Sequence, residues 1–330
     1  MDPKVAIIIL NWNGWEDTTE CLESLYQINY ENYDVILVDN NSEDNSIEII
    51  KNQCYNGIYN KSKEYKQVIK VEEYEEQDIE SMDYKVKENE GKKLFLLKNS
   101  KNYGFAKGNN IGIKFALKVF KPEYILLLNN DTYVDENFLK ELIKATEIRD
   151  HVGIYAPKIL NANNPKKIDS TGHIFSWGRI VDRGNGKIDK NQYDNKINVI
   201  GAKGAACLYK REMLESIGLF KEEYETLYED SELSWRAHNN SWNARFVPKS
   251  LVYHKISKSI KKVDSRISYY QKLSLNNITL TVSDYGTRNQ KILYTFLLLK
   301  SMLISYFVIL VGKSYSGKLN YLKAIKSLYS

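Results

Sequence analysis

The chain has 330 residues, of which 43% are hydrophobic and 27% charged, and its net charge is +5. This is enough apolar sequence for a large core, and the length predicts one large domain or two. The three cysteines are scattered and odd in number, which excludes a disulfide framework or zinc site and favours a cytoplasmic location. The sequence contains no helix-turn-helix, zinc-knuckle or RNP pattern, so we expect no nucleic-acid partner, and its strand-like start predicts no signal peptide.

Strands and helices alternate along the first 50 residues. Residues 5–10 (VAIIIL) form an apolar run typical of a buried strand, and residues 18–27 place apolar side chains at helical spacing. A second strand is predicted at residues 33–38, and a second helix begins at residue 46. This order predicts an α/β fold with right-handed βαβ units and a mostly parallel, Rossmann-like sheet.

The alternation stops between residues 55 and 93. This stretch is rich in Lys, Glu, Tyr and Asn and has little apolar periodicity, so we interpret it as an insertion that forms a flap or a hairpin. The alternation then resumes with, in chain order, a strand at 94–97, a helix at 109–119, a strand at 124–128, a helix at 136–146, a strand at 151–156, a hairpin at 172–186, an extended segment at 199–209 and helices at 211–217 and 229–239.

The end of the chain has a different character. We expect one α/β domain over residues 1–264 and a helical, apolar extension over residues 265–330. Residues 292–311 are long enough to span a bilayer, but Lys300 near their centre would cost about 3 kcal/mol there. A true span and an amphipathic helix on a membrane or a partner both stay open. Because residues 249–262 are basic, we expect the protein to be peripheral to, or anchored in, the cytoplasmic membrane.

A polar tripeptide, Asn129-Asn130-Asp131, directly follows the predicted strand at 124–128. Ligands of open α/β sheets bind beyond the carboxyl ends of the strands, so Asp131 is predicted to lie at a binding site. A carboxylate with a nearby amide suits a hard divalent cation, Mg²⁺ or Mn²⁺, that holds a phosphate. The alternative is that the tripeptide only makes a turn and caps the following helix.

Polar residues also follow the first two predicted strands. Asn11 and Asn13 come after the first strand, and Asp39 and Asn41 come after the second. Two polar loops at neighbouring strand ends form a nucleotide cleft in folds of this kind, where Asp39 could accept the N3–H of uracil or thymine. Helix capping by Asp39 or Ser42 explains the same residues equally well.

Three glycines, Gly104, Gly108 and Gly112, follow the third predicted strand, and Asn110 lies among them. Glycines permit close approach of the backbone to a ligand, and a helix N-terminus at this place could face a phosphate. The segment lacks the Gly-Lys-Ser/Thr of a P-loop, and it does not follow the first strand as a dinucleotide fingerprint does. The glycines alone therefore identify no nucleotide class.

An acidic cluster begins the predicted helix at 229–239. Glu229, Asp230 and Glu232 lie in its first turn, where the helix dipole favours negative charge whatever the function. The functional interpretation is that Asp230 faces the cleft as a general base. Further along the chain, His254 could be a structural histidine, or it could complete a metal site with Asp131.

The order of these motifs resembles the family 2 glycosyltransferases with the GT-A fold, in the branch described as rhamnosyltransferase-like. The motifs are IILNWNG (8–14), VILVDNNSEDNS (35–46), NSKNYGFAKGNNIGI (99–113), YILLLNNDT (124–132), GAKGAACLYKRE (201–212), GLF (218–220), YEDSELSWRAH (228–238) and VYH (252–254). Each motif alone is weak evidence for the family, but the order in which they occur together is specific to it. Two features depart from the family pattern: Asn129 stands where its Asp-x-Asp metal motif has the first Asp, and residues 55–93 are additional.

The resemblance implies roles for individual positions. Asp39 would contact the base of the nucleotide, Asp131 and His254 would bind the metal, and Asp230 would be the general base. Further contacts to the nucleotide sugar would come from Asn11, Asn13, Asn41, Gly104, Asn110, Asn129, Asn130, Lys203, Gly204 and Ala205. The acceptor would be bound by Glu229, Trp235 and Arg236.

These roles describe an inverting, metal-dependent glycosyltransferase. It would move a sugar from a UDP- or dTDP-linked donor, with dTDP-rhamnose among the options, to a glycan or lipid-linked acceptor. One base is enough, because a nucleoside diphosphate neutralised by a cation is already a good leaving group. Two alternatives stay open. A nucleotidyltransferase is disfavoured by the Asn-Trp-Asn-Gly-Trp loop after the first strand, and a non-catalytic glycan- or membrane-binding protein could use the same fold.

Overall fold

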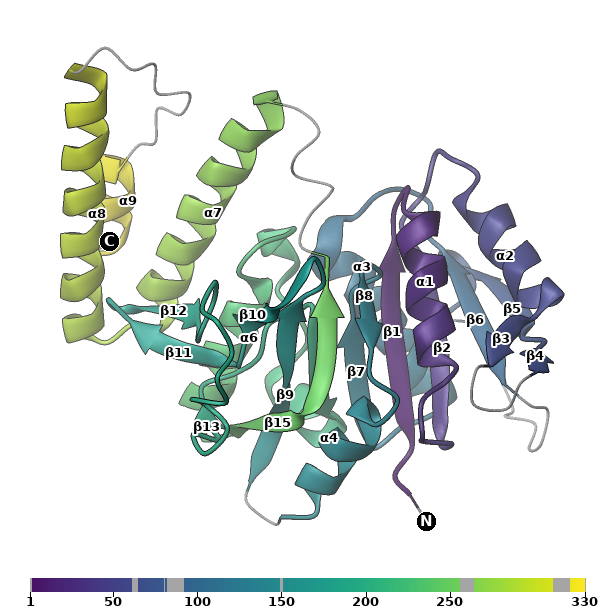
Figure 1. The fold of residues 1–330 in the computed structure, drawn as a ribbon. Coiled ribbons are helices and arrows are strands. Elements are labelled where there is room, and N and C mark those ends of the chain that lie inside the picture. The colour runs from purple at the N-terminus through teal and green to yellow at the C-terminus, as the bar shows by residue number, and fades with distance from the viewer. Residues whose placement is uncertain are drawn as a thin grey trace.

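The computed structural model describes residues 2–60, 65–79, 81, 92–148, 151–255, 264–310 and 321–329. Within these ranges the chain builds an 11-stranded sheet with helices on both faces (Figure 1). Along the sheet the strands are β13 (Asn198–Val199), β15 (Asn243–His254), β9 (Val152–Asn161), β14 (Ala206–Lys210), β7 (Tyr124–Leu128), β1 (Val5–Asn11), β2 (Tyr33–Asp39), β6 (Lys93–Lys98) and β5 (Lys70–Glu75); β10 (Asn164–Ser170) pairs with β9, and β8 (Thr132–Val134) pairs with β15.

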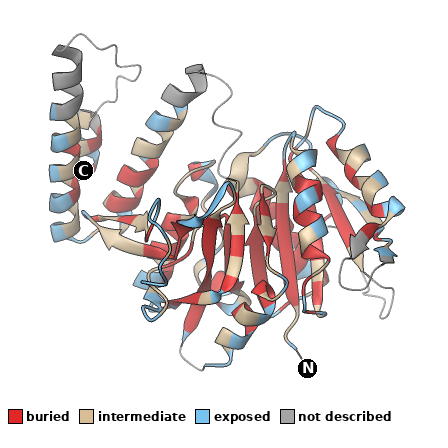
Figure 2. Ribbon diagram, in the orientation of Figure 1, coloured by how far each residue is buried: buried red, intermediate tan, exposed pale blue. Residues whose placement is uncertain are grey.

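The predicted parallel sheet forms one half of this structure. Strands β7, β1, β2, β6 and β5 pair in parallel, whereas β14 runs antiparallel between β7 and β9. The β1–β2 register places Asn11 opposite Asp39 at the carboxyl edge. The central strands are buried on both faces (Figure 2), which explains why they are continuous apolar runs in the sequence.

Alternate residues of β1 pack against different helices. Val5, Ile7 and Ile9 face the cluster that includes α1 (Trp15–Leu25), α2 (Ser46–Asn56) and α4 (Phe138–Thr146). Ala6 and Ile8 face the cluster on the opposite side of the sheet, which includes α3 (Gly104–Val119), α5 (Arg211–Ile217) and α6 (Glu229–Asn239). The sheet is therefore covered on both faces and exposes its carboxyl edge for ligand binding.

The stretch predicted as an insertion is only partly separate from the sheet. Strands β3 (Ile58–Asn60) and β4 (Tyr65–Gln67) form a small hairpin, but β5 joins the main sheet as an edge strand beside β6. Strand β5 was not predicted because its sequence, KVEEYE, has no apolar pattern. Charged residues are common on exposed sheet edges, where β5 lies. Residues 61–64, 80 and 82–91 of the predicted insertion lie outside the described residues.

The C-terminal region consists of α7 (Asp264–Tyr285), α8 (Arg288–Leu310) and α9 (Tyr321–Ser327). Val282, Tyr294 and Ala324 from these helices share a small core with Trp235 of α6. No helix in the described ranges is long and apolar enough to cross a membrane, so the true span considered for residues 292–311 is not found. The domain boundary at residue 264 stays a prediction.

Candidate active site

A cleft of about 800 Å³ opens at the carboxyl edge of the sheet. It is bordered by the loop after β1, the tripeptide after β7, the segment before β14 and the first turn of α6. Among the residues singled out in the sequence, those that line the cleft are Asn13, Asn129, Asn130, Asp131, Lys203, Gly204, Ala205, Glu229, Asp230 and His254.

The tripeptide after β7 forms a turn but does not cap a helix. The Asn129 N–H donates to the Ala205 carbonyl oxygen (2.9 Å), and the Asn130 side chain donates to Thr18 Oγ1 (3.0 Å). Strand β8 follows the turn directly, and α4 begins only at Phe138. The turn therefore directs Asp131 into the cleft, and the helix-capping alternative is excluded.

Asp131 and His254 come together because β8 pairs with the end of β15. His254 Nε2 lies 3.2 Å from Asp131 Oδ1, and its Nδ1 lies 2.8 Å from Oδ2 of the buried Asp169. Burial would lower the pKa of His254, but hydrogen bonds with Asp131 and Asp169 outweigh it and raise the pKa to about 9. Asp169 fixes the ring so that Nε2 faces Asp131, as carboxylates behind metal-binding histidines do.

This pair fits a divalent cation in part. Within the described ranges no group of three or more His, Cys, Asp and Glu side chains is arranged to hold a metal ion. A cation bound to Asp131 and His254 would therefore take its other ligands from substrate phosphates and water, which is how Mg²⁺ is commonly held at phosphate sites. Asn129 lines the same cleft and offers a neutral amide oxygen.

Asp230 lies in the first turn of α6 and is held by backbone donors. Its Oδ2 accepts the Gly204 N–H (2.7 Å), and its Oδ1 accepts the Ser231 N–H (2.6 Å). The neighbouring Glu229 is buried, and its Oε2 has no hydrogen-bond partner among the described residues. Burial and then the charge of Asp230 raise the Glu229 pKa well above its usual value.

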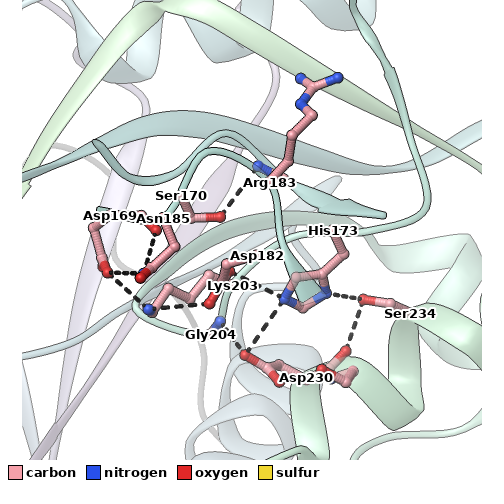
Figure 3. Close-up of polar contacts among 12 residues, drawn as sticks. Asp169, Ser170, His173, Asp182, Arg183, Asn185, Lys203, Gly204, Asp230 and Ser234 are labelled. Carbon is pink, nitrogen blue, oxygen red and sulfur yellow. Dashed lines mark hydrogen bonds and ion pairs between the residues drawn. The ribbon is translucent and has the colours of Figure 1, made fainter. Parts of the chain in front are cut away.

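A charged network extends from Asp169, which lies behind His254, to Asp230 (Figure 3). Lys203 Nζ lies between Asp169 Oδ1 (2.9 Å) and Asp182 Oδ2 (3.2 Å). Burial would lower the pKa of Lys203, but the two carboxylates raise it above its usual value, so the lysine stays charged. His173 then lies between Asp182 and Asp230.

The predicted base contact, Asp39, lies beneath the cleft instead of lining it. Its carboxylate accepts hydrogen bonds from Asn11 Nδ2 (2.8 Å), the Ser42 N–H (2.9 Å) and Ser42 Oγ (2.6 Å). Asp39 and Asn11 are both buried and do not line the cleft, and neither Asp39 nor Ser42 caps α2, which begins after Asn45. Asn41 is exposed outside the cleft. These residues shape the loops on which Asn13 is presented.

Four other predicted contacts are structural. Gly104 begins α3 with a φ of +77°, and Asn110 exchanges two hydrogen bonds with the Phe220 backbone (2.8 and 3.1 Å). Trp235 is buried against Phe175, which corrects its assignment to the acceptor site. Arg236 pairs with Glu232 (2.8 Å) and donates to backbone carbonyls of residues 217–219, which corrects the same assignment. None of the four lines the cleft.

Several cleft residues were missed by the sequence reasoning. Trp12, Phe105, Tyr228 and Tyr270 contribute aromatic surface, and His173 and Asp182 contribute titratable groups; Asp169 lies behind His254. Strands β11 (His173–Ser176) and β12 (Arg179–Asp182) pair so that His173 is opposite Asp182. Their hairpin was predicted, so a search for titratable residues opposite each other in it would have found this pair.

Family models match most of the chain. The model of glycosyl transferase family 2 matches residues 6–218, and that of glycosyl transferase family group 2 matches residues 124–325. The low-salt glycan biosynthesis hexosyltransferase Agl10 of Haloferax volcanii is 27% identical over 145 residues, which are 43% of this chain and 45% of that protein. The aligned part thus spans less than half of that relative.

Solved structures share the fold at low sequence identity. TarS residues 1–349 of S. aureus has a TM-score of 0.51 at 15% identity, covering 88% of this chain and 69% of that one. GalNAc-T7 with UDP, GalNAc and Mn²⁺ has a TM-score of 0.60 at 14% identity (98% and 54%). The mannosyltransferase PcManGT of Pyrobaculum calidifontis, with GDP-Man and Mn²⁺, has a TM-score of 0.53 at 13% identity (99% and 84%). The fold is the GT-A fold, and the chain belongs to glycosyl transferase family 2.

Proposed function

We propose that this glycosyltransferase is an inverting, metal-dependent enzyme that uses Asp230 as its general base. The observation that carries the proposal is that Asp230 and the Asp131–His254 pair line one cleft. The cleft thus contains a carboxylate held by backbone donors, Asp230, and a pair of side chains suited to a cation, Asp131 and His254. An inverting transfer requires this division of roles.

The residues of the chain would act as follows. Asp131 and His254 would hold Mg²⁺ or Mn²⁺, and the cation would neutralise the departing diphosphate. Asp230 would take the proton of the acceptor hydroxyl as that oxygen attacks the anomeric carbon. The N–H groups of Gly204 and Ser231 keep the carboxylate oriented for this step. The raised pKa of Glu229 favours its neutral form, which adds no second negative charge beside the base.

The donor is a nucleotide sugar, and we favour a UDP- or dTDP-linked one. Similar folds have been solved with UDP, UDP-GlcNAc and GDP-Man, two of them with Mn²⁺. The motif resemblance to the rhamnosyltransferase-like branch keeps dTDP-rhamnose among the options. The exposed Trp12 at the cleft is suited to stacking on a nucleobase or a sugar ring.

The acceptor is a glycan or a lipid-linked glycan, and two features support a place at an anionic membrane surface. Ile292, Phe296 and Leu303 form an exposed apolar stripe at helical spacing on α8. Residues 249–330 contain 14 Lys and Arg against 2 Asp, whereas residues 1–248 have an excess of acids. An apolar stripe on a basic region binds the interface of anionic bilayers. Sedimentation with phosphatidylglycerol vesicles, but not with phosphatidylcholine vesicles, is expected.

The test is a panel of UDP- and dTDP-sugars with Mg²⁺ or Mn²⁺, in which release of the nucleoside diphosphate is measured with and without EDTA. Asp230→Asn should lower turnover by about 10²–10⁴-fold and preserve donor binding measured by calorimetry. Glu147→Gln, a change outside the cleft, is the matched control. Full turnover by Asp230→Asn would refute the base assignment. Donor binding without turnover by the wild-type protein would favour the non-catalytic alternative.

A further inference from the structure

A buried histidine stands directly behind the proposed base. His173, the first residue of β11, is 2% exposed, and its Nε2 lies 4.0 Å from Asp230 Oδ2 (Figure 3). Two backbone hydrogen bonds of 2.8 Å hold this residue in place. The His173 N–H donates to the Gly201 carbonyl oxygen, and the His173 carbonyl oxygen accepts the Ile200 N–H. The ring therefore has a defined position relative to the carboxylate.

The hydrogen bonds of Ser234 determine which ring nitrogen of His173 carries a proton. The single hydroxyl proton of Ser234 is donated to the Asp230 carbonyl oxygen (2.7 Å). Ser234 Oγ can therefore only accept from His173 Nδ1, which lies 3.2 Å away. Gly201 makes this packing possible, because a Cβ there would lie 1.9 Å from Ser234 Oγ. In the neutral ring, Nδ1 is protonated and Nε2 is an unprotonated acceptor.

This unprotonated Nε2 faces two carboxylates. Asp182 Oδ1 is 3.6 Å away, and that oxygen is buried without a hydrogen-bond partner among the described residues. The other oxygen, Asp182 Oδ2, is held by Lys203 (3.2 Å). Between Asp182 and Asp230, a proton placed on Nε2 would satisfy the unpaired oxygen and would be stabilised by negative charge on both sides.

We propose that His173 is a positioning residue that receives from Asp230 the proton taken from the acceptor hydroxyl. The inference rests on Asp230 being the base. The proton leaves the acceptor oxygen as the new glycosidic bond forms, resides on Asp230, and moves to Nε2; Nδ1 keeps its proton, so the ring becomes an imidazolium between Asp182 and Asp230. The 4.0 Å gap is closed by rotation of the carboxylate or by one water.

The charges around His173 favour this transfer. Asp182 on β12 and Asp230 on α6 face the ring, Lys203 compensates Asp182 from behind, and burial raises the pKa of the neighbouring Glu229. Once Asp230 has accepted its proton, Asp182 is the remaining carboxylate that attracts a proton to Nε2. Transfer to His173 restores the charged form of Asp230, which is then ready for the next acceptor. Asp182 is partly exposed and gives the proton a route to solvent.

The first experiment measures the ring directly and needs no substrate. The chain has four histidines, so ¹⁵N-histidine NMR of the full protein is readily assigned with the variant His173→Asn. We expect the neutral ring to carry its proton on Nδ1, which leaves Nε2 free to accept the proton from Asp230. A neutral ring that carries its proton on Nε2 would overturn the proposal.

The second experiment uses the nucleotide sugar that the wild-type protein turns over in the panel. His173→Asn retains a donor for Ser234 and lacks the titratable Nε2, so kcat should fall about tenfold or more with KM unchanged. The pH dependence of kcat should differ from that of the wild-type protein, because the variant lacks a titratable ring at this position. A lower kcat with an unchanged pH profile would show that His173 has only a structural role and would overturn the proposal. Turnover by Asp230→Asn would instead refute the base, so the two failures are distinguishable.

Discussion

The two sides of the cleft bury polar groups in different ways. On the β1–β2 side, Asp39 is satisfied by the neutral donors of Asn11 and Ser42. On the β10–β12 side, acids alternate with Lys203 and two histidines in the order Asp131, His254, Asp169, Lys203, Asp182, His173 and Asp230. A neutral network mainly fixes loop shape, whereas buried charges are expensive and depend on their partners. The neutral side is therefore suited to holding the loops in place, and the charged side is where we place the proposed proton transfer and cation binding.

The largest effect is expected on the charged side of the cleft, as a loss in the free energy of unfolding. Lys203→Met leaves Asp169 and Asp182 near each other without their cation, and an uncompensated buried charge costs about 3–5 kcal/mol. Urea denaturation should show this loss in the free energy of unfolding. The exposed Lys187→Met is the control. A loss below about 0.5 kcal/mol would mean that the network is not coupled.

The next prediction separates metal binding from fold. Asp131→Ala should weaken Mn²⁺-dependent binding of UDP by about 100-fold, because the cation loses its carboxylate ligand, and should leave the metal-free affinity unchanged. Calorimetry with Mn²⁺ and with EDTA measures both values, with Glu147→Gln as control. An equal loss under the two conditions would argue against a metal role for Asp131.

A smaller effect is expected on the neutral side. Asp39→Asn replaces a carboxylate that accepts three hydrogen bonds, so the unfolding free energy should fall by about 1–3 kcal/mol. Because Asp39 does not line the cleft, the Mn²⁺ dependence of nucleotide binding should be retained. Selective loss of uridine or thymidine nucleotide binding, with normal stability, would instead restore Asp39 as a base contact.

The smallest effect concerns Glu229, where the substitution is expected to stabilise the fold instead of destabilising it. The folded-state pKa of Glu229 is raised, so above the unfolded-state pKa the unfolded chain binds fewer protons, and stability falls as pH rises toward the folded-state pKa. Glu229→Gln removes this slope and should raise the Tm at pH 8 by a few degrees more than at pH 5. Thermal unfolding at both pH values checks it, and an unchanged slope would show that Glu229 is ionised in the fold.

The elements with strong local patterns were predicted well. The strands expected at 5–10, 33–38 and 124–128 match β1, β2 and β7, and the helix expected at 229–239 matches α6. Strand β5 was missed because its charged residues gave no apolar signal, and β8 was missed because its three residues are too short for a period. Residues 292–311 were open to interpretation as a span, because their sequence does not show that Tyr294 and Leu298 pack against protein.

The sequence by itself determined the α/β alternation, the carboxyl-edge position of Asp131 and the family, because apolar periodicity and motif order are local properties of the chain. Only the tertiary structure decided which polar residues meet. Asp39 and Arg236 are satisfied within the protein, whereas Asp169, His173 and Asp182 contact residues far along the chain, which are His254, Asp230 and Lys203 respectively. Side-chain type states what a residue can do, but burial and the identity of its neighbours determine which role it takes.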